Sequence, residues 1–129
     1  MVISLFKIFL FLILITFCAG YNVRAASYEI AILQGLDKVT ARVLTIEAPI
    51  GKVVSFGALE IIVRTCDKRP PEETPESTIF LDIWEVFQGE PAQSLFRGWM
   101  FASSPALSAM EHPVYDVWVL DCKNADINS

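Results

Sequence analysis

The sequence has little of what catalytic sites are usually built from. It carries one histidine, His112, in 129 residues, and three cysteines, Cys18, Cys66 and Cys122. No C-x-x-C pair is present, so the spacing typical of structural zinc sites is missing. No G-x-S-x-G motif marks a nucleophile elbow. We therefore expect no catalytic residue, no metal site and no cofactor.

Basic residues are also scarce. Ten Lys and Arg stand against 15 Asp and Glu, which gives a formal net charge of −5. Nucleic acids and anionic lipid surfaces bind through clustered Lys and Arg that neutralise phosphates. The acidic balance therefore predicts that nucleic acid is not a partner.

The apolar run Ile8–Phe17 falls short of the roughly 20 apolar residues that a membrane-spanning helix needs. Lys7 precedes it and small residues follow it, which is the layout of a secretory signal peptide. Cleavage fits after Gly20 or after Ala25, and we favour Ala25. We expect residues 1–25 to be a signal peptide and the protein to be exported to the periplasm of a Gram-negative envelope. No stable span would remain after cleavage; an uncleaved anchor is the weaker alternative.

Cysteine use agrees with export. Cys18 would be a lipidation site only if a small residue preceded it, and Phe17 stands there, so we expect it to leave with the signal. The even pair Cys66 and Cys122 then predicts a disulfide in an oxidising compartment. In the chain-entropy model a bridge closing so long a loop stabilises by about 4 kcal/mol. A zinc site using both cysteines, His112 and Asp67 is the weaker reading.

Residues 26–123 are typical of an all-β domain. Alternating, β-branched segments separated by Gly and Pro turns predict strands at 39–46, 52–56, 58–65, 78–87, 95–102 and 114–121. Ser27–Gln34 has no firm periodicity and fits an extended arm or an edge strand. Ser104 before Pro105 predicts an N-cap and one short helical turn. We therefore predict a small single-domain β-sandwich or barrel, followed by a disordered tail at 124–129.

Alternation also predicts where the cysteines face. In 58–65, Leu59 and Val63 share one face, so Cys66 falls on the opposite, half-polar face. Counting back from Cys122 in steps of two also gives a mixed face. We therefore predict a bridge between two neighbouring strand ends.

Aromatic residues form the strongest candidate site. Thr78–Phe87 is apolar on both sides and predicts a central strand. In 95–102, Phe96 and Met100 share one side, whereas Arg97, Trp99 and Phe101 share the other. If that second side is uncovered, it presents residue types that are enriched at interfaces and stack on sugars; otherwise the strand is buried on both sides. With the segment that follows, the candidate binding patch is Arg97, Trp99, Phe101, Ser103, Ser104 and His112.

Two segments carry a resemblance to a known family. They are CDKRPPEETPE at 66–76 and FRGWMFASSPALSAMEHPVYDVWVLDC at 96–122. Together they resemble the signature of an uncharacterised family of exported bacterial proteins, domain of unknown function 2155, over roughly Leu36–Lys123. The resemblance implies a small envelope-associated β domain and no known reaction, so it supplies no catalytic residue.

These features favour a non-catalytic binding or assembly module of the envelope, with another envelope protein as partner. They do not predict an oligomeric state. One alternative is a domain that binds a small ligand or cell-wall glycan by stacking on Trp84, Trp99 or Trp118. Another is a hydrolase that uses His112 with a nearby serine. The segment Pro70–Pro75 fits either a solvated spacer or an extended docking segment.

Overall fold

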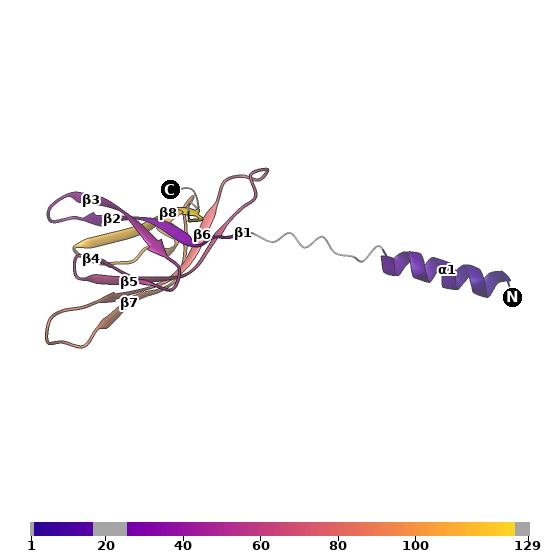
Figure 1. Cartoon of the computed structure of the whole chain (residues 1–129), viewed down its shortest axis with the longest axis horizontal. Helices are drawn as coiled ribbons and strands as arrows, with labels where there is room; N and C mark the ends of the chain where they lie inside the picture. Colours follow the sequence, from indigo (N-terminus) through magenta and orange to yellow (C-terminus); the bar gives the residue numbers. More distant parts are fainter. Residues whose placement is uncertain (1, 17–25, 126–129) are drawn as a thin grey trace.

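The computed structural model describes residues 2–16 and 26–125 of the chain (Figure 1). The apolar N-terminal segment forms helix α1 (Val2–Thr16). Within these described ranges, no helix is both long enough and apolar enough to cross a membrane. The cleavage sites expected after Gly20 and Ala25, and Cys18, lie outside the described residues.

The larger sheet, sheet A, is built around two long antiparallel strands. β5 (Leu59–Lys68) pairs with β6 (Ser77–Glu85), and β7 (Gln93–Phe101) pairs with the other edge of β6. β1 (Ala26–Ser27) and β4 (Val53–Phe56) share the remaining edge of β5. β6 is therefore central, as its two-sided apolar pattern predicts.

The smaller sheet, sheet B, has the strand order β3-β2-β8. β2 (Ile30–Asp37) lies between β3 (Arg42–Pro49) and β8 (Tyr115–Lys123), antiparallel to both. The stretch that fitted an arm or an edge strand therefore supplies a central strand. Its buried face is nevertheless regular, because Ala31, Leu33 and Gly35 alternate inward.

β3 begins three residues later than the alternation from Val39 predicts. Asp37 Oδ1 accepts hydrogen bonds from the N–H groups of Val39 and Thr40, at 2.9 and 3.2 Å. Ala41 adopts a φ of 56°, in the left-handed region. Both features belong to a turn, so the apolar Val39 lies exposed at its tip.

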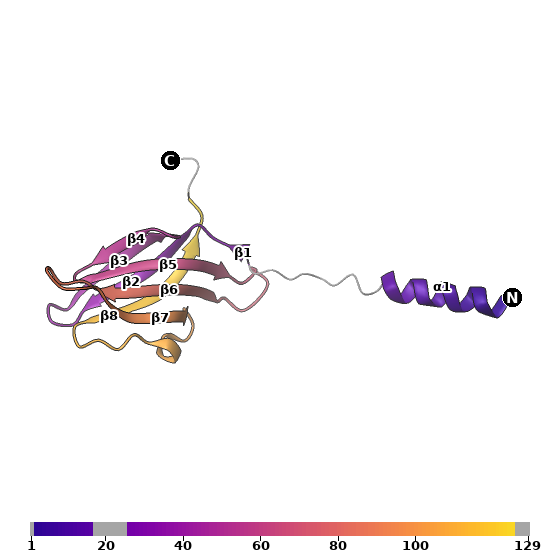
Figure 2. The same ribbon diagram turned by 90° about the horizontal axis from the view of Figure 1, so that it is seen from below.

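Sheets A and B pack face to face as a β-sandwich, and Figure 2 shows the two layers crossing over one another. The core is formed by inward residues of both sheets: Ala31, Leu33, Ile46, Ala48, Phe56, Leu59, Ile61, Val63, Ile79, Leu81, Ile83, Met100, Val117 and Val119. The predicted all-β class is confirmed in its sandwich form rather than as a closed barrel of the described strands.

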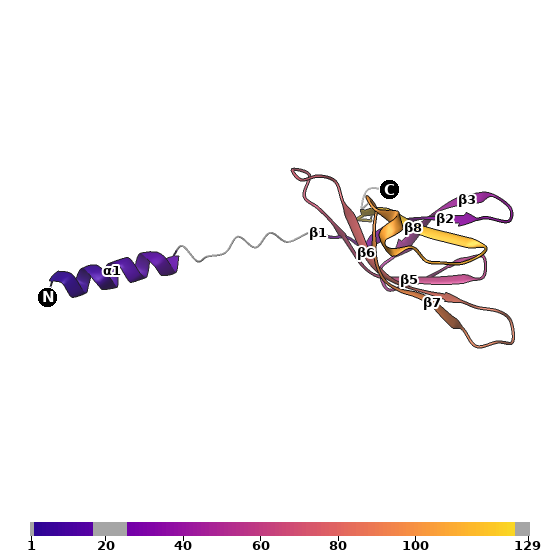
Figure 3. The ribbon, with the colours of Figure 1, turned by 180° about the vertical axis from the view of Figure 1, so that it is seen from behind.

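The connection from β7 to β8 contains the predicted short helical turn, η1 (Pro105–Ser108), which is a 3₁₀ helix beside β7 and β8 (Figure 3). Pro105 occupies its first turn as predicted. Ser104 stands at the N-cap position, but its side chain makes no capping hydrogen bond. The helix therefore begins with the preset φ of proline and not with a side-chain cap.

The predicted disulfide is present, but its placement differs from the prediction. Cys66 on β5 and Cys122 on β8 are bonded, with Cα atoms 5.9 Å apart, and both are buried. The bond joins the two sheets and not neighbouring strand ends. The predicted half-polar faces are wrong because each strand carries a β-bulge before its cysteine. The ladder registers skip Arg64 in β5 and Leu120 in β8, and each skip reverses the alternation.

The first two residues of the predicted tail make hydrogen bonds with Glu29. The Asn124 side-chain oxygen accepts a hydrogen bond from the Glu29 N–H at 3.3 Å, and the Ala125 N–H donates to Glu29 Oε2 at 3.2 Å. These contacts extend the ordered chain past Lys123. Residues 126–129 lie outside the described residues.

Candidate functional site

The outward side of sheet A collects aromatic and charged side chains. Strand register places Thr78 opposite Phe101, Phe80 opposite Trp99, and Asp82 opposite Arg97. Ile62 on β5 is also opposite Asp82, and Arg64 reaches the same carboxylate. We call this surface the aromatic face, made up of Ile62, Arg64, Thr78, Phe80, Asp82, Arg97, Trp99 and Phe101.

Trp99 is the exposed aromatic side chain of the aromatic face, and it lies on the edge strand β7. Its side chain is 44% exposed, whereas its neighbour Met100 points the other way and is buried in the core. Phe80 packs edge to face against Trp99, with ring centroids 5.3 Å apart. The predicted division of this strand, with Arg97, Trp99 and Phe101 on one side, is confirmed, and the alternative of a strand buried on both sides is wrong.

A buried carboxylate lies beside these rings. The Asp82 side chain is only 3% exposed. Its Oδ2 accepts a hydrogen bond from Arg64 Nε at 3.0 Å, and Arg97 Nε lies 3.4 Å from Oδ1. The Arg97 guanidinium also lies over the Phe80 ring, 5.9 Å from its centroid. Two cations therefore flank one anion, which leaves a net positive charge on the face.

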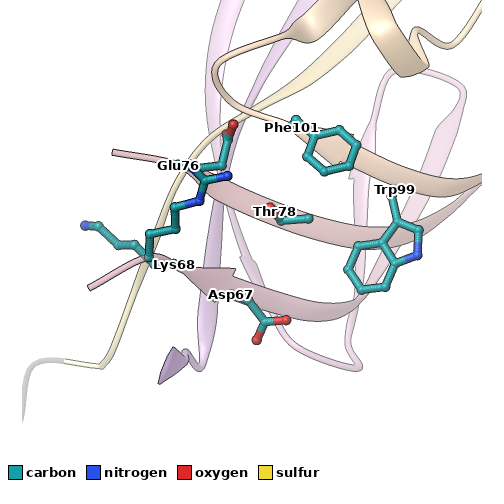
Figure 4. Close-up of a pocket in the computed structure, with 7 residues that line it drawn as sticks. Asp67, Lys68, Glu76, Thr78, Trp99 and Phe101 are labelled. Atoms are coloured by element: carbon teal, nitrogen blue, oxygen red, sulfur yellow. The ribbon is translucent and has the colours of Figure 1, made fainter. Parts of the chain in front are cut away.

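A pocket of about 430 Å³ opens at one end of the aromatic face (Figure 4). Trp99 and Phe101 form its apolar side, and Thr78 lies between them and β5. Its polar rim consists of Asp67, Lys68, Arg69 and Glu76. Asp67 Oδ1 is already engaged by the Ser27 hydroxyl at 3.0 Å. The pocket thus combines an aromatic wall with hydrogen-bonding groups.

Ser103, a predicted patch residue, fastens the base of the loop between β5 and β6. Its N–H donates to Glu76 Oε1 at 3.0 Å, and its hydroxyl donates to the other carboxylate oxygen. Burial raises the pKa of the Glu76 carboxyl, but hydrogen bonds from Ser103 and Ser77 and the charge of Arg69 outweigh it, so the pKa lies below its ordinary value. Ser103 therefore positions the pocket rim.

His112, another predicted patch residue, lies away from the aromatic face. Its Nε2 contacts the Glu85 carboxylate at the end of β6, whereas Phe101 pairs with Thr78 at the start of β6. Its Nδ1 accepts the N–H groups of Val114 and Tyr115 at 3.0 and 3.1 Å. The imidazole therefore binds the chain entering β8, at the opposite end of the sandwich.

The other predicted residues are also dispersed. Ser104 belongs to the η1 turn and does not line the pocket. Trp118, offered with Trp99 as a stacking platform, lies on β8 in sheet B, beside η1. Trp84 continues the outward alternation of β6 but is half-buried. Within the described ranges, no three His, Cys, Asp or Glu side chains are grouped to hold a metal ion.

Sequence reasoning missed Arg64, Thr78, Phe80 and Asp82. Their signal was present in β6, where a lone aspartate interrupts an apolar strand at the same alternation as Thr78 and Phe80. A charge in a central strand requires a counter-charge on a neighbouring strand. Only the register between strands identifies Arg64 and Arg97 as those partners.

Comparison with known proteins identifies relatives but no activity. The model of the family described as "Uncharacterized protein conserved in bacteria (DUF2155)" matches residues 31–122. "Uncharacterized protein RP359" of Rickettsia prowazekii (strain Madrid E) is 30% identical over 102 residues, covering 79% of this chain and 66% of that protein. The chain thus spans just under two thirds of the length of this relative. No solved structure matches the chain.

Proposed function

This chain belongs to the DUF2155 family of uncharacterized bacterial proteins, and from that premise we propose that it is a non-catalytic binding or assembly module of the bacterial envelope. In this proposal the aromatic face holds another envelope protein. The observation that carries it is the exposure of Trp99 and Arg97 on the edge strand β7, on a sheet face whose opposite side is sealed in the core.

The residue types on this face are those that supply binding energy in protein interfaces. Trp and Arg are enriched among the residues whose truncation weakens complexes most, because they bury large areas and donate hydrogen bonds. Trp99 and Arg97 are 44% and 70% exposed, so a partner would remove much of their surface from water. Burial of this surface would stabilise the complex.

Two features of the chain support an envelope location. The Cys66–Cys122 bond needs an oxidising compartment to persist. The apolar α1 follows the layout of a signal peptide, with Lys7 before its apolar run. The acidic balance of the chain disfavours nucleic acid as the partner.

The arrangement of Ser103 and His112 supports a role without catalysis. A serine hydrolase needs the imidazole within hydrogen-bond reach of the nucleophile. Here the Ser103 hydroxyl donates to Glu76 while His112 contacts Glu85 at the other end of β6. Both side chains are occupied by structural contacts.

The test is crosslinking in the native envelope followed by capture of the tagged protein. We expect a discrete protein partner that is lost in Trp99→Ala. Phe87→Ala is the matched control, since Phe87 is similarly exposed, at 50%, but lies beyond the end of β6 and outside the aromatic face. A partner captured equally by both variants, or none at all, would contradict the proposal.

A second candidate function is favoured by the pocket. Its Trp99 and Phe101 wall, together with Thr78 and the rim residues Asp67 and Arg69, combines a stacking surface with hydrogen-bonding groups, as sugar sites do. If it binds cell-wall glycan, soluble wall fragments should change tryptophan fluorescence with a saturable dependence that Phe101→Ala weakens. An unchanged spectrum at millimolar fragment would remove this candidate.

A further inference from the structure

We propose that a second copy of this chain occupies the aromatic face, and that the loop between β5 and β6 of each copy docks there. We call this loop, residues 69–76, the acidic proline loop. The inference rests on the proposed function, because it names the protein that the same face holds. Its basis is that the chain carries, on its own surface, a segment whose charge and apolar character complement that face.

The aromatic face offers a binding place for a carboxylate beside apolar surface. Arg64 and Arg97 share the single charge of Asp82, and each approaches it through Nε. Their terminal guanidinium nitrogens are therefore donors available to another carboxylate, in the planar geometry that arginine favours. The adjoining Trp99 and Phe80 rings supply the apolar contact. The matching segment should pair acidic side chains with proline or aliphatic groups.

The acidic proline loop has this composition. It reads Arg-Pro-Pro-Glu-Glu-Thr-Pro-Glu, and residues 71–75 are all exposed. Proline rings pack on aromatic side chains, and extended proline-containing segments are a recurring class of ligand for aromatic-lined surfaces. Glu72 and Glu73 between the prolines supply the carboxylates. The loop thus complements the aromatic face in both respects.

The loop is also held in shape before binding. The Arg69 N–H donates to the Glu76 carbonyl, and the Glu73 N–H donates to the Pro70 carbonyl, both at 3.0 Å. Ser103 fixes the Glu76 side chain at the base. A segment that is already ordered loses little conformational entropy on docking. Its exposed prolines therefore add to affinity at small entropic cost.

Placement makes a reciprocal contact possible. The loop continues beyond the ends of β5 and β6 (Figure 1), and its stem residues Arg69 and Glu76 line the pocket with Trp99 and Phe101. Loop and pocket thus share one end of sheet A. Two copies that overlap at this end about a twofold axis place each loop on the face of the other. This is the self-complementary contact of a symmetric dimer.

The test is a charge exchange between loop and face, read by sedimentation of the oxidised protein over a range of concentrations. The loop variant is Glu72→Lys with Glu73→Lys, and the face variant is Arg97→Glu, which leaves Arg64 paired with Asp82. Each alone should raise the dimer dissociation constant about tenfold or more, because like charges then meet at both contacts. An equimolar mixture should regain dimers, because each reversed loop then meets a reversed face.

One control variant separates docking from a change of net charge, a further variant tests the apolar contact, and urea unfolding detects damage to the fold. Glu90→Lys with Glu111→Lys changes the net charge of the protein as the loop variant does, at exposed sites outside loop and face, and should leave dimers intact. Trp99→Ala keeps both arginines and should also weaken the dimer about tenfold or more. Urea unfolding of every variant verifies that it is folded.

The inference is overturned if the wild-type protein is monomeric at all concentrations, if both variants dimerise as the wild type does, or if the mixture stays monomeric. A monomer that still captures a Trp99-dependent envelope protein overturns this inference and leaves the proposed function standing. A monomer that captures none contradicts both.

Discussion

At the scale of single residues, the His112 side chain stabilises the start of β8 through its hydrogen bonds. Its Nδ1 accepts two backbone N–H groups while Nε2 contacts Glu85. His112→Ala leaves these N–H groups without their acceptor, and we expect the free energy of unfolding to fall by about 1–3 kcal/mol. Urea denaturation measures it. Glu111→Ala, at an exposed neighbour, should change little, and equal losses in the two variants would contradict the role.

Gly57 and Gly51 allow the cost of a backbone conformation to be separated from the cost of packing. Both have positive φ, 57° and 80°, but a Cβ on Gly57 would lie 2.5 Å from the Tyr115 hydroxyl, whereas one on Gly51 meets nothing within 4 Å. We expect Gly51→Ala to cost about 1–2 kcal/mol for its left-handed backbone. Gly57→Ala should cost clearly more, because Tyr115 must move and loses the Ala58 N–H. Equal changes in thermal midpoint would contradict this.

Part of the candidate site could be predicted residue by residue. Arg97, Trp99 and Phe101 follow from alternation within one strand, which needs no knowledge of neighbours. The contact of Arg64 with Asp82 could not be predicted, because it joins two strands and Arg64 lies at a bulge. His112 lies close to the patch in sequence but at the far end of the sandwich in space. Alternation predicts faces, whereas only strand register predicts which residues meet.

At the scale of elements, two carboxylates fasten the base of the acidic proline loop. Glu76 is bound by Ser103, and Asp121 is bound by Lys68, the Cys122 N–H and Ser77. Burial raises the pKa of Asp121, but these donors outweigh it, so the pKa of Asp121, like that of Glu76, lies below its ordinary value. Both groups bind a proton less readily in the folded protein than in the unfolded chain.

Linkage then gives the sign of the pH dependence. A lowered folded pKa contributes stability that is complete above the ordinary values of 4.5 and 3.8 and is lost as pH falls through the folded values. We expect Glu76→Gln with Asp121→Asn to be less stable than wild type at pH 7 and to lose less stability on acidification below about pH 4.5. Urea midpoints from pH 7 to pH 3 measure this. Parallel curves for variant and wild type would contradict it, and Ser103→Ala should show a partial effect.

The bulges in β5 and β8 show where a period of two predicts the wrong face for a side chain. The faces of β5 and β8 follow a period of two up to Arg64 and Leu120, and the skipped residues then move both cysteines into the core. A one-residue shift reverses every later side chain. No composition signal marks either bulge. Buried cysteines at both strand ends could have suggested them, because a disulfide between sheets requires inward side chains.

At the scale of the whole molecule, local sequence patterns predict that the chain forms a β-sandwich. They do not predict the order of the strands within each sheet. Strong alternation located β5, β7 and β8, and apolar content on both sides located β6 as central. β2 was missed as a central strand because Gln34 and Gly35 weaken its pattern, while its neighbours β3 and β8 supply the pairing. Pairing with residues far along the chain is a property of the assembled sheets.

The Cys66–Cys122 bond joins those sheets across 56 residues of sequence. Its loss frees the unfolded chain, and the chain-entropy model gives a stabilisation of about 4 kcal/mol for a loop of this length. We therefore expect Cys66→Ala with Cys122→Ala to lower the free energy of unfolding by about this amount, measured by urea denaturation. Reductant should bring the wild type to the same level and leave the variant unchanged. Equal free energies of unfolding for the oxidised wild type and the variant would contradict this prediction.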